Sequence, residues 1–117
     1  MRYRKLKFKP EYLTQLITGR KKTTIRMERK YTLGETVYIA DTNGRIYGKA
    51  VVDNIVEKEL SRLTEEDAIV DGFNSLDELL RALGEIYGEL PPDQKIYIYH
   101  LKILRWRDQA LSSSQRK

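Results

Sequence analysis

The stretch GRKKTTIR, residues 19–26, carries helix-ending, basic and strand-forming residues within eight positions. Gly19 is typical of the end of a helix, and the β-branched residues further along favour a strand. In that strand Thr24 and Arg26 lie on one face, because side chains alternate with a period of two. We expect the loop to fold Lys21 back beside them, so that an amine, a hydroxyl and a guanidinium are gathered at one place.

Two kinds of chemistry fit this gathering. Arg20, Lys22 and Arg26 surround Lys21 with like charges, and like charges and burial both lower the pKa of a lysine. Lys21 is then a usable base beside the Thr24 hydroxyl. Alternatively, the basic side chains form a clamp for phosphate groups. A third interpretation is an ordinary basic loop before an edge strand.

Local signals on both sides of this stretch predict an α+β fold. Asn43-Gly44 is a hairpin signal, and the last strand is apolar on both faces, which indicates a central position in a sheet. The predicted order is a strand at 2–8, a helix from Pro10 to Gly19, strands at 23–26, 36–41 and 45–58, a short helix after Thr64, a helix at 76–87 and a strand at 95–105. This order favours a small, partly closed barrel of about five to six strands with two to three helices packed against it.

Three smaller features refine this expectation. Ser75 and Glu78 have the spacing of a full capping box, and Thr64 and Asp67 that of a capping box with a shorter acid. Gly48, inside a long strand, predicts a bulge or a close backbone approach. We expect residues 1–107 to form a single domain and residues 108–117 a flexible basic tail.

The composition excludes several classes of protein. The 117 residues contain no cysteine, so disulfides, thiolate metal sites and cysteine nucleophiles are excluded. With one histidine, His100, we expect no metal site and no cofactor. No apolar run approaches the roughly 18 residues of a membrane helix, and the charged N-terminus lacks a signal-peptide pattern, so we expect a cytoplasmic protein. The charged fraction of 33% leans toward the composition of thermophilic proteins.

The positive charges are concentrated at the two ends of the chain. Residues 1–30 hold 11 basic and 2 acidic residues, a net charge of +9, whereas residues 31–94 have a net charge of −9 and residues 95–117 one of +5. Folding that joins the two ends creates a basic surface, and such surfaces attract phosphates through counterion release. The charge count alone fits a solvated surface of mixed charge, whereas the clustering in residues 1–30 favours an anionic partner.

The order of the motifs resembles that of the ASCH domain family, whose fold is PUA-like. The centre of the resemblance is the pattern G-x-K-x-x-[E/T]-x-R after a short helix, at residues 19–26. Further motifs agree in order: the turn Tyr31–Glu35, the strand Gly48–Ala50, the helix start Leu63–Glu66 and the helix Ser75–Leu79. The resemblance covers about residues 3–105 and implies a PUA-like barrel that binds RNA or a modified nucleoside in a basic cleft at the motif.

Position 24 points to one branch of that family. Many ASCH proteins carry glutamate there, and the threonine of this chain is similar to that of small bacterial 4-acetylcytidine amidohydrolases. The resemblance implies that Lys21 and Thr24 match two residues to which their activity is attributed. The third, a glutamate, falls on Asp71, which is one methylene shorter. The implied catalytic set is therefore Lys21, Thr24 and Asp71, without a metal.

Four functions stay open from the sequence. They are a module that binds RNA or a modified nucleoside, an amidohydrolase of 4-acetylcytidine, an RNA nuclease and a structural interaction domain. Arg20, Lys22 and Arg26 are the expected substrate-binding cations. Trp106, between two arginines, is the expected platform for stacking a base, whereas His100 is interpreted as structural.

Overall fold

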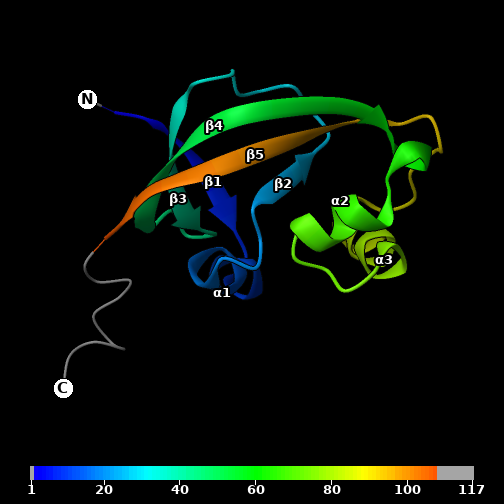
Figure 1. Ribbon diagram of the computed structural model, residues 1–117, viewed down its shortest axis with the longest axis horizontal. Helices are drawn as coiled ribbons and strands as arrows, with labels where there is room; N and C mark the ends of the chain where they lie inside the picture. Colours follow the sequence, from blue (N-terminus) through cyan, green and yellow to red (C-terminus); the bar gives the residue numbers. More distant parts are fainter. Residues whose placement is uncertain (1, 108–117) are drawn as a thin grey trace.

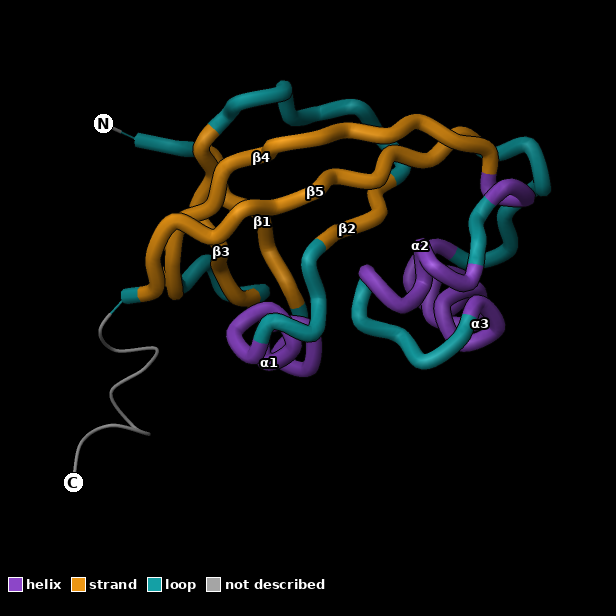
Figure 2. Tube along the Cα trace, in the orientation of Figure 1, coloured by secondary structure: helices purple, strands orange, loops and turns teal. Residues whose placement is uncertain are grey.

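The computed structural model describes residues 2–107 and builds them around one five-stranded sheet (Figure 1). The strands are β1 (Arg4–Phe8), β2 (Thr23–Arg26), β3 (Thr36–Asp41), β4 (Ile46–Glu59) and β5 (Lys95–Trp106). They lie in the order β1-β3-β4-β5-β2, with β1 parallel to β3 and the other pairs antiparallel. The sheet curls into a half-barrel (Figure 2), which confirms the predicted α+β class and partly closed PUA-like barrel. The predicted tail, 108–117, lies outside the described residues.

Three α-helices lie on the concave side of this sheet (Figures 1 and 2). They are α1 (Pro10–Thr18), α2 (Glu65–Val70) and α3 (Leu76–Tyr87), and a single 3₁₀ turn, η1 (Leu60–Arg62), follows β4. As predicted, α1 begins with a proline in its first turn and ends at Gly19, whose φ of +85° suits a glycine. No helix within residues 2–107 is long and apolar enough to span a membrane.

Of the two predicted capping boxes, the one at Thr64 is complete and the one at Ser75 is not. The Thr64 hydroxyl accepts from the main chain of Asp67, and the Asp67 carboxylate accepts from the main chain of Thr64, so the box with the shorter acid is complete. Ser75 caps α3 by accepting from the main chain of Glu78. The Glu78 carboxylate, however, accepts from the main chain of Asn74, one residue before the cap. The full box predicted at Ser75 is therefore wrong in its second half.

The long pair β4–β5 forms the spine of the molecule and contains the predicted close approach at Gly48. Gly48 pairs with Trp106, and a Cβ atom at Gly48 would lie 2.6 Å from the Trp106 ring. The register between β3 and β4 also shifts beside Gly48, so that Tyr47 is the extra residue of a bulge. Both predicted features therefore occur at Gly48, and the indole of Trp106 fills the space that a side chain there would need.

The sheet is wide enough to support two hydrophobic clusters side by side. The first packs α1 against β1, β3 and β4 and includes Leu16 and Val37. The second packs α2 and α3 against β2 and the first half of β5 and includes Leu79 and Ile96. Strand β5 contributes to both clusters, as expected for a central strand with two apolar faces. Between α1 and α3 lies a cleft that is lined by part of the motif at 19–26.

Candidate functional site

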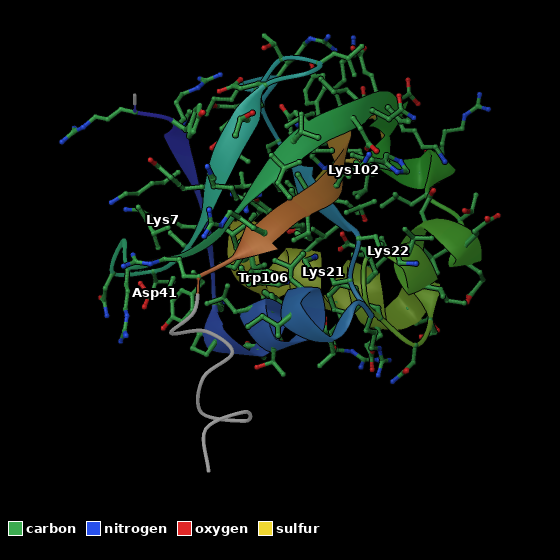
Figure 3. The ribbon with its side chains drawn as sticks, turned by 60° about the vertical axis from the view of Figure 1, so that its left-hand side comes forward. Lys7, Lys21, Lys22, Asp41, Lys102 and Trp106 are labelled. Carbon is green, nitrogen blue, oxygen red and sulfur yellow. The ribbon has the colours of Figure 1, made fainter. Side chains whose placement is uncertain are left out.

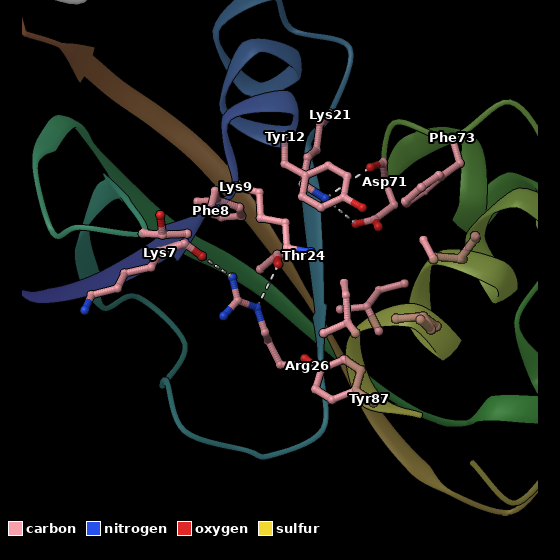
Figure 4. Close-up of a pocket in the computed structure, with 16 residues that line it drawn as sticks. Lys7, Phe8, Lys9, Tyr12, Lys21, Thr24, Arg26, Asp71, Phe73 and Tyr87 are labelled. Carbon is pink, nitrogen blue, oxygen red and sulfur yellow. Dashed lines mark hydrogen bonds and ion pairs between the residues drawn. The ribbon is translucent and has the colours of Figure 1, made fainter. Parts of the chain in front are cut away.

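A cleft with a volume of about 170 Å³ opens between α1, β2 and α3 (Figure 4). We call it the inner cleft. Its lining comes from the end of β1 and α1 (Lys7, Phe8, Lys9, Tyr12), from the 19–26 motif (Lys21, Thr24, Ile25, Arg26), from Thr42, from the segment after α2 (Asp71, Phe73) and from α3 (Leu79, Ala82, Leu83, Ile86, Tyr87). The side formed by the motif is polar, whereas the side formed by α3 is mostly apolar.

Lys21 and Asp71 form a buried ion pair in the lining of the inner cleft. The Lys21 Nζ atom lies 3.1 Å from Asp71 Oδ1 and 3.1 Å from the main-chain oxygen of Asp71. Both side chains are only 5% exposed, and the Thr23 hydroxyl donates to Asp71 Oδ1 over 2.8 Å. Two of the directions around the amine nitrogen are thus fixed by oxygen atoms of one residue. Within residues 2–107 the amine forms no other hydrogen bond to the protein.

The main chain around the motif explains why residues 50 positions apart meet. The main-chain N–H of Lys21 donates to the carbonyl of Gln15 at 3.0 Å, and that of Lys22 donates to the carbonyl of Val70 at 2.9 Å. The loop is therefore tied to α1 on one side and to the end of α2 on the other. Gly72, with a φ of +100°, turns the chain immediately after Asp71.

Burial changes the proton affinity of both partners of the pair. It lowers the pKa of the Lys21 amine, and the Asp71 carboxylate only partly opposes this effect. It also raises the pKa of the Asp71 carboxyl group, against the influence of Lys21 and of the hydrogen bond from Thr23. The ammonium form of Lys21 is therefore less favoured than in water, which suits an amine that accepts a proton.

Thr24 and Arg26 lie on one face of β2, as the period-two pattern predicts. The Arg26 Nε–H donates to Thr24 Oγ1 over 2.9 Å, and its Nη2 donates to the main-chain oxygen of Lys7 over 3.0 Å. The guanidinium also lies over the Phe8 ring, 5.2 Å from its centroid. These contacts fix the guanidinium beside the hydroxyl. They occupy the Thr24 oxygen as an acceptor and leave its hydrogen available to a base.

The structure brings together four of the seven residues that the sequence nominated. Lys21, Thr24, Arg26 and Asp71 all line the inner cleft. The exposed Arg20 and Lys22 do not, because their loop turns them outward; Arg20 donates to the Asn74 side chain instead.

Trp106 is also absent from the lining of the inner cleft. It lies at the end of β5 (Figure 3), and its indole is held against Gly48. Its ring lies against the bulge of β4 and not in the inner cleft, and the stacking role of Trp106 stays a prediction.

The aromatic residues of the inner cleft come from outside the motif and were not nominated. The ring of Tyr12 lies beneath the Lys21 amine, with 5.4 Å between Nζ and the ring centroid. Tyr12 also meets Phe73 edge to face at 6.0 Å. Phe8 and Tyr87 complete the aromatic lining. No local signal distinguishes these rings from ordinary core residues, since their contacts depend on the packing of α1 against the α2–α3 pair.

The described residues offer little to a metal ion. Within residues 2–107 no group of three or more histidine, cysteine, aspartate or glutamate side chains is arranged to hold one.

Comparison with known proteins shows which solved structures have a similar fold. No protein-family model and no curated protein sequence matches the chain. Its structure is similar to an ASCH domain from Lactobacillus crispatus, with a TM-score of 0.66, 13% identity and coverage of 90% of this chain and 80% of that chain. It is also similar to ASCH from Zymomonas mobilis, with a TM-score of 0.64, 16% identity and coverage of 93% and 76%.

A third similar structure is a protein from Enterococcus faecalis described by the family name DUF984. Its TM-score is 0.64 and its identity 16%, with coverage of 90% of this chain and 74% of that chain. The predicted ASCH-like fold is thereby confirmed. The branch of the family, and with it the activity, stays a prediction.

Proposed function

We propose that the inner cleft binds the base of a modified nucleoside, either free or within RNA. Its volume of about 170 Å³ is close to that of cavities of roughly 150 Å³ that hold benzene. This is room for one six-membered ring with a small substituent. The apolar side chains of α3 suit the faces of such a ring, and the motif presents polar atoms to its edge.

We further propose that the bound base is 4-acetylcytosine and that the protein removes its acetyl group. The observation that carries this proposal is the buried Lys21–Asp71 pair in the same cleft as the Thr24 hydroxyl. Burying an ion pair costs several kcal/mol per ion in desolvation and seldom adds net stability. A module that only binds has no need of this cost, whereas an amide-hydrolysing enzyme needs an amine of lowered pKa next to a nucleophile.

The proposed step uses these groups in order. The neutral Lys21 amine takes the proton of the Thr24 hydroxyl, and the Thr24 oxygen attacks the acetyl carbonyl carbon. Arg26 stabilises the negative charge on the carbonyl oxygen. The C–N bond then breaks, and Lys21 returns the proton to the departing amino group of cytosine. Water hydrolyses the acetyl-threonine ester and releases acetate, with Lys21 again acting as the base.

The other functions receive less support. A module that only binds leaves the buried pair without a purpose. An RNA nuclease finds no histidine in the inner cleft, since His100 pairs with Thr23 between β5 and β2 and is not among the lining residues.

The test is the release of acetate from 4-acetylcytidine by the purified chain. We expect release by the wild type, and a loss of about 10²–10⁴-fold for Lys21→Met, the typical cost of removing a catalytic acid or base. Thr24→Val should lose a similar factor, and the double variant should lose no more, because a nucleophile and its base act as a unit.

Lys22→Met is the matched control, because it removes the same charge from an exposed neighbour in the same loop. It should retain the activity. Binding of 4-acetylcytidine without release of acetate would leave a binding module, and equal losses in Lys21→Met and Lys22→Met would contradict the role of the buried amine.

A further inference from the structure

A second cavity, of about 370 Å³, adjoins the inner cleft. It is lined by Arg26, Met27, Glu28, Lys30, Tyr31 and Tyr87, and we call it the outer cavity. Arg26 and Tyr87 line both cavities. A ligand that passes between these two side chains therefore occupies both spaces at once.

The side chain of Tyr99 is fully buried and holds the loop of residues 28–30, which forms part of the wall of the outer cavity. The Tyr99 hydroxyl donates to the main-chain oxygen of Glu28 over 2.7 Å and accepts from the main-chain N–H of Lys30 over 2.8 Å. The Tyr31 hydroxyl donates to the main-chain oxygen of Lys5 over 3.2 Å. The loop that carries Glu28 and Lys30 is thus held in one conformation before any ligand arrives, which lowers the cost of binding.

The geometry of a pyrimidine fits the order of groups along β2. The ring carries its exocyclic amine at C4 and its sugar at N1, on opposite sides. The Arg26 Nε atom lies 2.9 Å from Thr24 Oγ1, and Arg26 also borders the outer cavity, so the sugar-bearing end of a cytosine whose amide lies at these two groups can reach that cavity. In Figure 4 the Lys21–Asp71 pair lies at one end of the inner cleft and Arg26 and Tyr87 lie at the other. An amide at C4 placed beside Thr24 therefore directs N1 toward the outer cavity.

We propose that the outer cavity is a ribose subsite, in which the Glu28 carboxylate accepts hydrogen bonds from the vicinal hydroxyl groups of the nucleoside. This inference rests on the proposed function of the inner cleft. Carboxylates are the usual partners of ribose hydroxyl groups in nucleotide-binding proteins. Within residues 2–107 the Glu28 carboxylate has no ion-pair or hydrogen-bond partner of its own and is free to take this role.

The subsite predicts a preference for nucleosides over bare bases. We would compare 4-acetylcytidine, its 2′-deoxy analogue and 4-acetylcytosine by calorimetric titration of the full chain, and by kcat/KM where acetate is released. The wild type should favour 4-acetylcytidine over 4-acetylcytosine by about tenfold, the scale of a hydrogen bond to a charged group. Glu28→Gln should lose most of this preference and leave the affinity for 4-acetylcytosine unchanged, and the 2′-deoxy analogue should fall between the two ligands.

Glu59→Gln is the control, because it makes the same change at the exposed end of β4, away from both cavities. Glu28 is itself exposed, so its variant should keep the melting temperature of the wild type. Equal affinity of the wild type for the base and the nucleoside, or an equal loss for both ligands in Glu28→Gln, would refute the ribose subsite and leave the inner cleft intact. Binding of neither ligand would refute both proposals.

Discussion

The substitution Asp71→Asn tests how the buried pair is held. It preserves the shape of the side chain and an oxygen for the Thr23 hydroxyl, but removes the charge that faces Lys21. Both side chains of the pair are 5% exposed, so water does not replace the lost carboxylate. Removal of one partner from a buried ion pair typically costs about 3–5 kcal/mol. Because the main-chain oxygen of Asp71 still accepts from the amine, we expect the lower end, about 3 kcal/mol.

A double variant compares the cost of removing both charges of the pair with the cost of removing one. Lys21→Met combined with Asp71→Asn leaves no charge in the buried site, since methionine fills most of the lysine volume. Replacing a whole buried pair with uncharged side chains is often neutral or stabilising. The double variant should therefore be more stable than Asp71→Asn alone, although it carries one more substitution.

The lowered pKa of Lys21 also determines whether the free energy of unfolding rises or falls with pH. The folded pKa of Lys21 lies below its ordinary value of 10.5, so between these two values the unfolded chain binds more protons than the folded one. The free energy of unfolding then rises with pH in this window. In Asp71→Asn the opposing carboxylate is gone, which lowers the folded pKa further and extends the window toward neutral pH. The variant should therefore regain stability relative to the wild type as the pH rises through the part of this window below the folded pKa of wild-type Lys21.

Urea denaturation at several pH values measures all three outcomes. Thermal denaturation reports the same loss: at roughly 4 °C per kcal/mol for a domain of this size, a loss of about 3 kcal/mol lowers the melting temperature by about 12 °C. The reasoning fails if Asp71→Asn loses less than about 1 kcal/mol, the value typical of an exposed pair, or if the double variant is the least stable of the set.

Two further predictions concern residues outside the proposed catalytic set. Trp106→Ala should lower the free energy of unfolding by about 1–3 kcal/mol, because its ring packs on Gly48, while acetate release and nucleoside affinity stay unchanged; a selective loss of nucleoside affinity would support the stacking role. Tyr99→Phe removes the hydroxyl that holds Glu28 and Lys30 and should cost about 1–3 kcal/mol in urea denaturation. It should also reduce the preference for 4-acetylcytidine over 4-acetylcytosine, and an unchanged preference would contradict the idea that this loop forms the ribose subsite.

The helices and strands were predictable because their signals are local. Gly19 ends α1 through its own φ angle, and the hairpin forms where Asn43-Gly44 predicts it. Its connection is nevertheless longer than the two-residue turn that this pair favours. The Asp41 carboxylate accepts from the main chains of Asn43 and Arg45, so that β4 begins only at Ile46. A side-chain contact with neighbouring main-chain groups thus adjusted the boundary but not the existence of the strand.

The site was predictable only where it is local in sequence. Thr24 and Arg26 share a face because of the strand period, and this holds without knowledge of the rest of the fold. The outward orientation of Arg20 and Lys22 depends on the two main-chain hydrogen bonds that tie their loop to Gln15 and Val70. The partner of Trp106 depends on the register of β4 with β5. Composition and spacing contain neither piece of information.

Asp71 shows most clearly what a sequence leaves open. An aspartate where the resemblance described above implies a glutamate suggests a side chain too short to meet Lys21, if the main chain is imagined at a fixed distance. In this chain the main-chain oxygen of Asp71 is itself 3.1 Å from the Lys21 amine. The backbone therefore comes close enough that the shorter acid suffices, and the turn at Gly72 permits this approach. The length of the acidic side chain and the position of its main chain compensate for each other, and the structure is needed to evaluate the second.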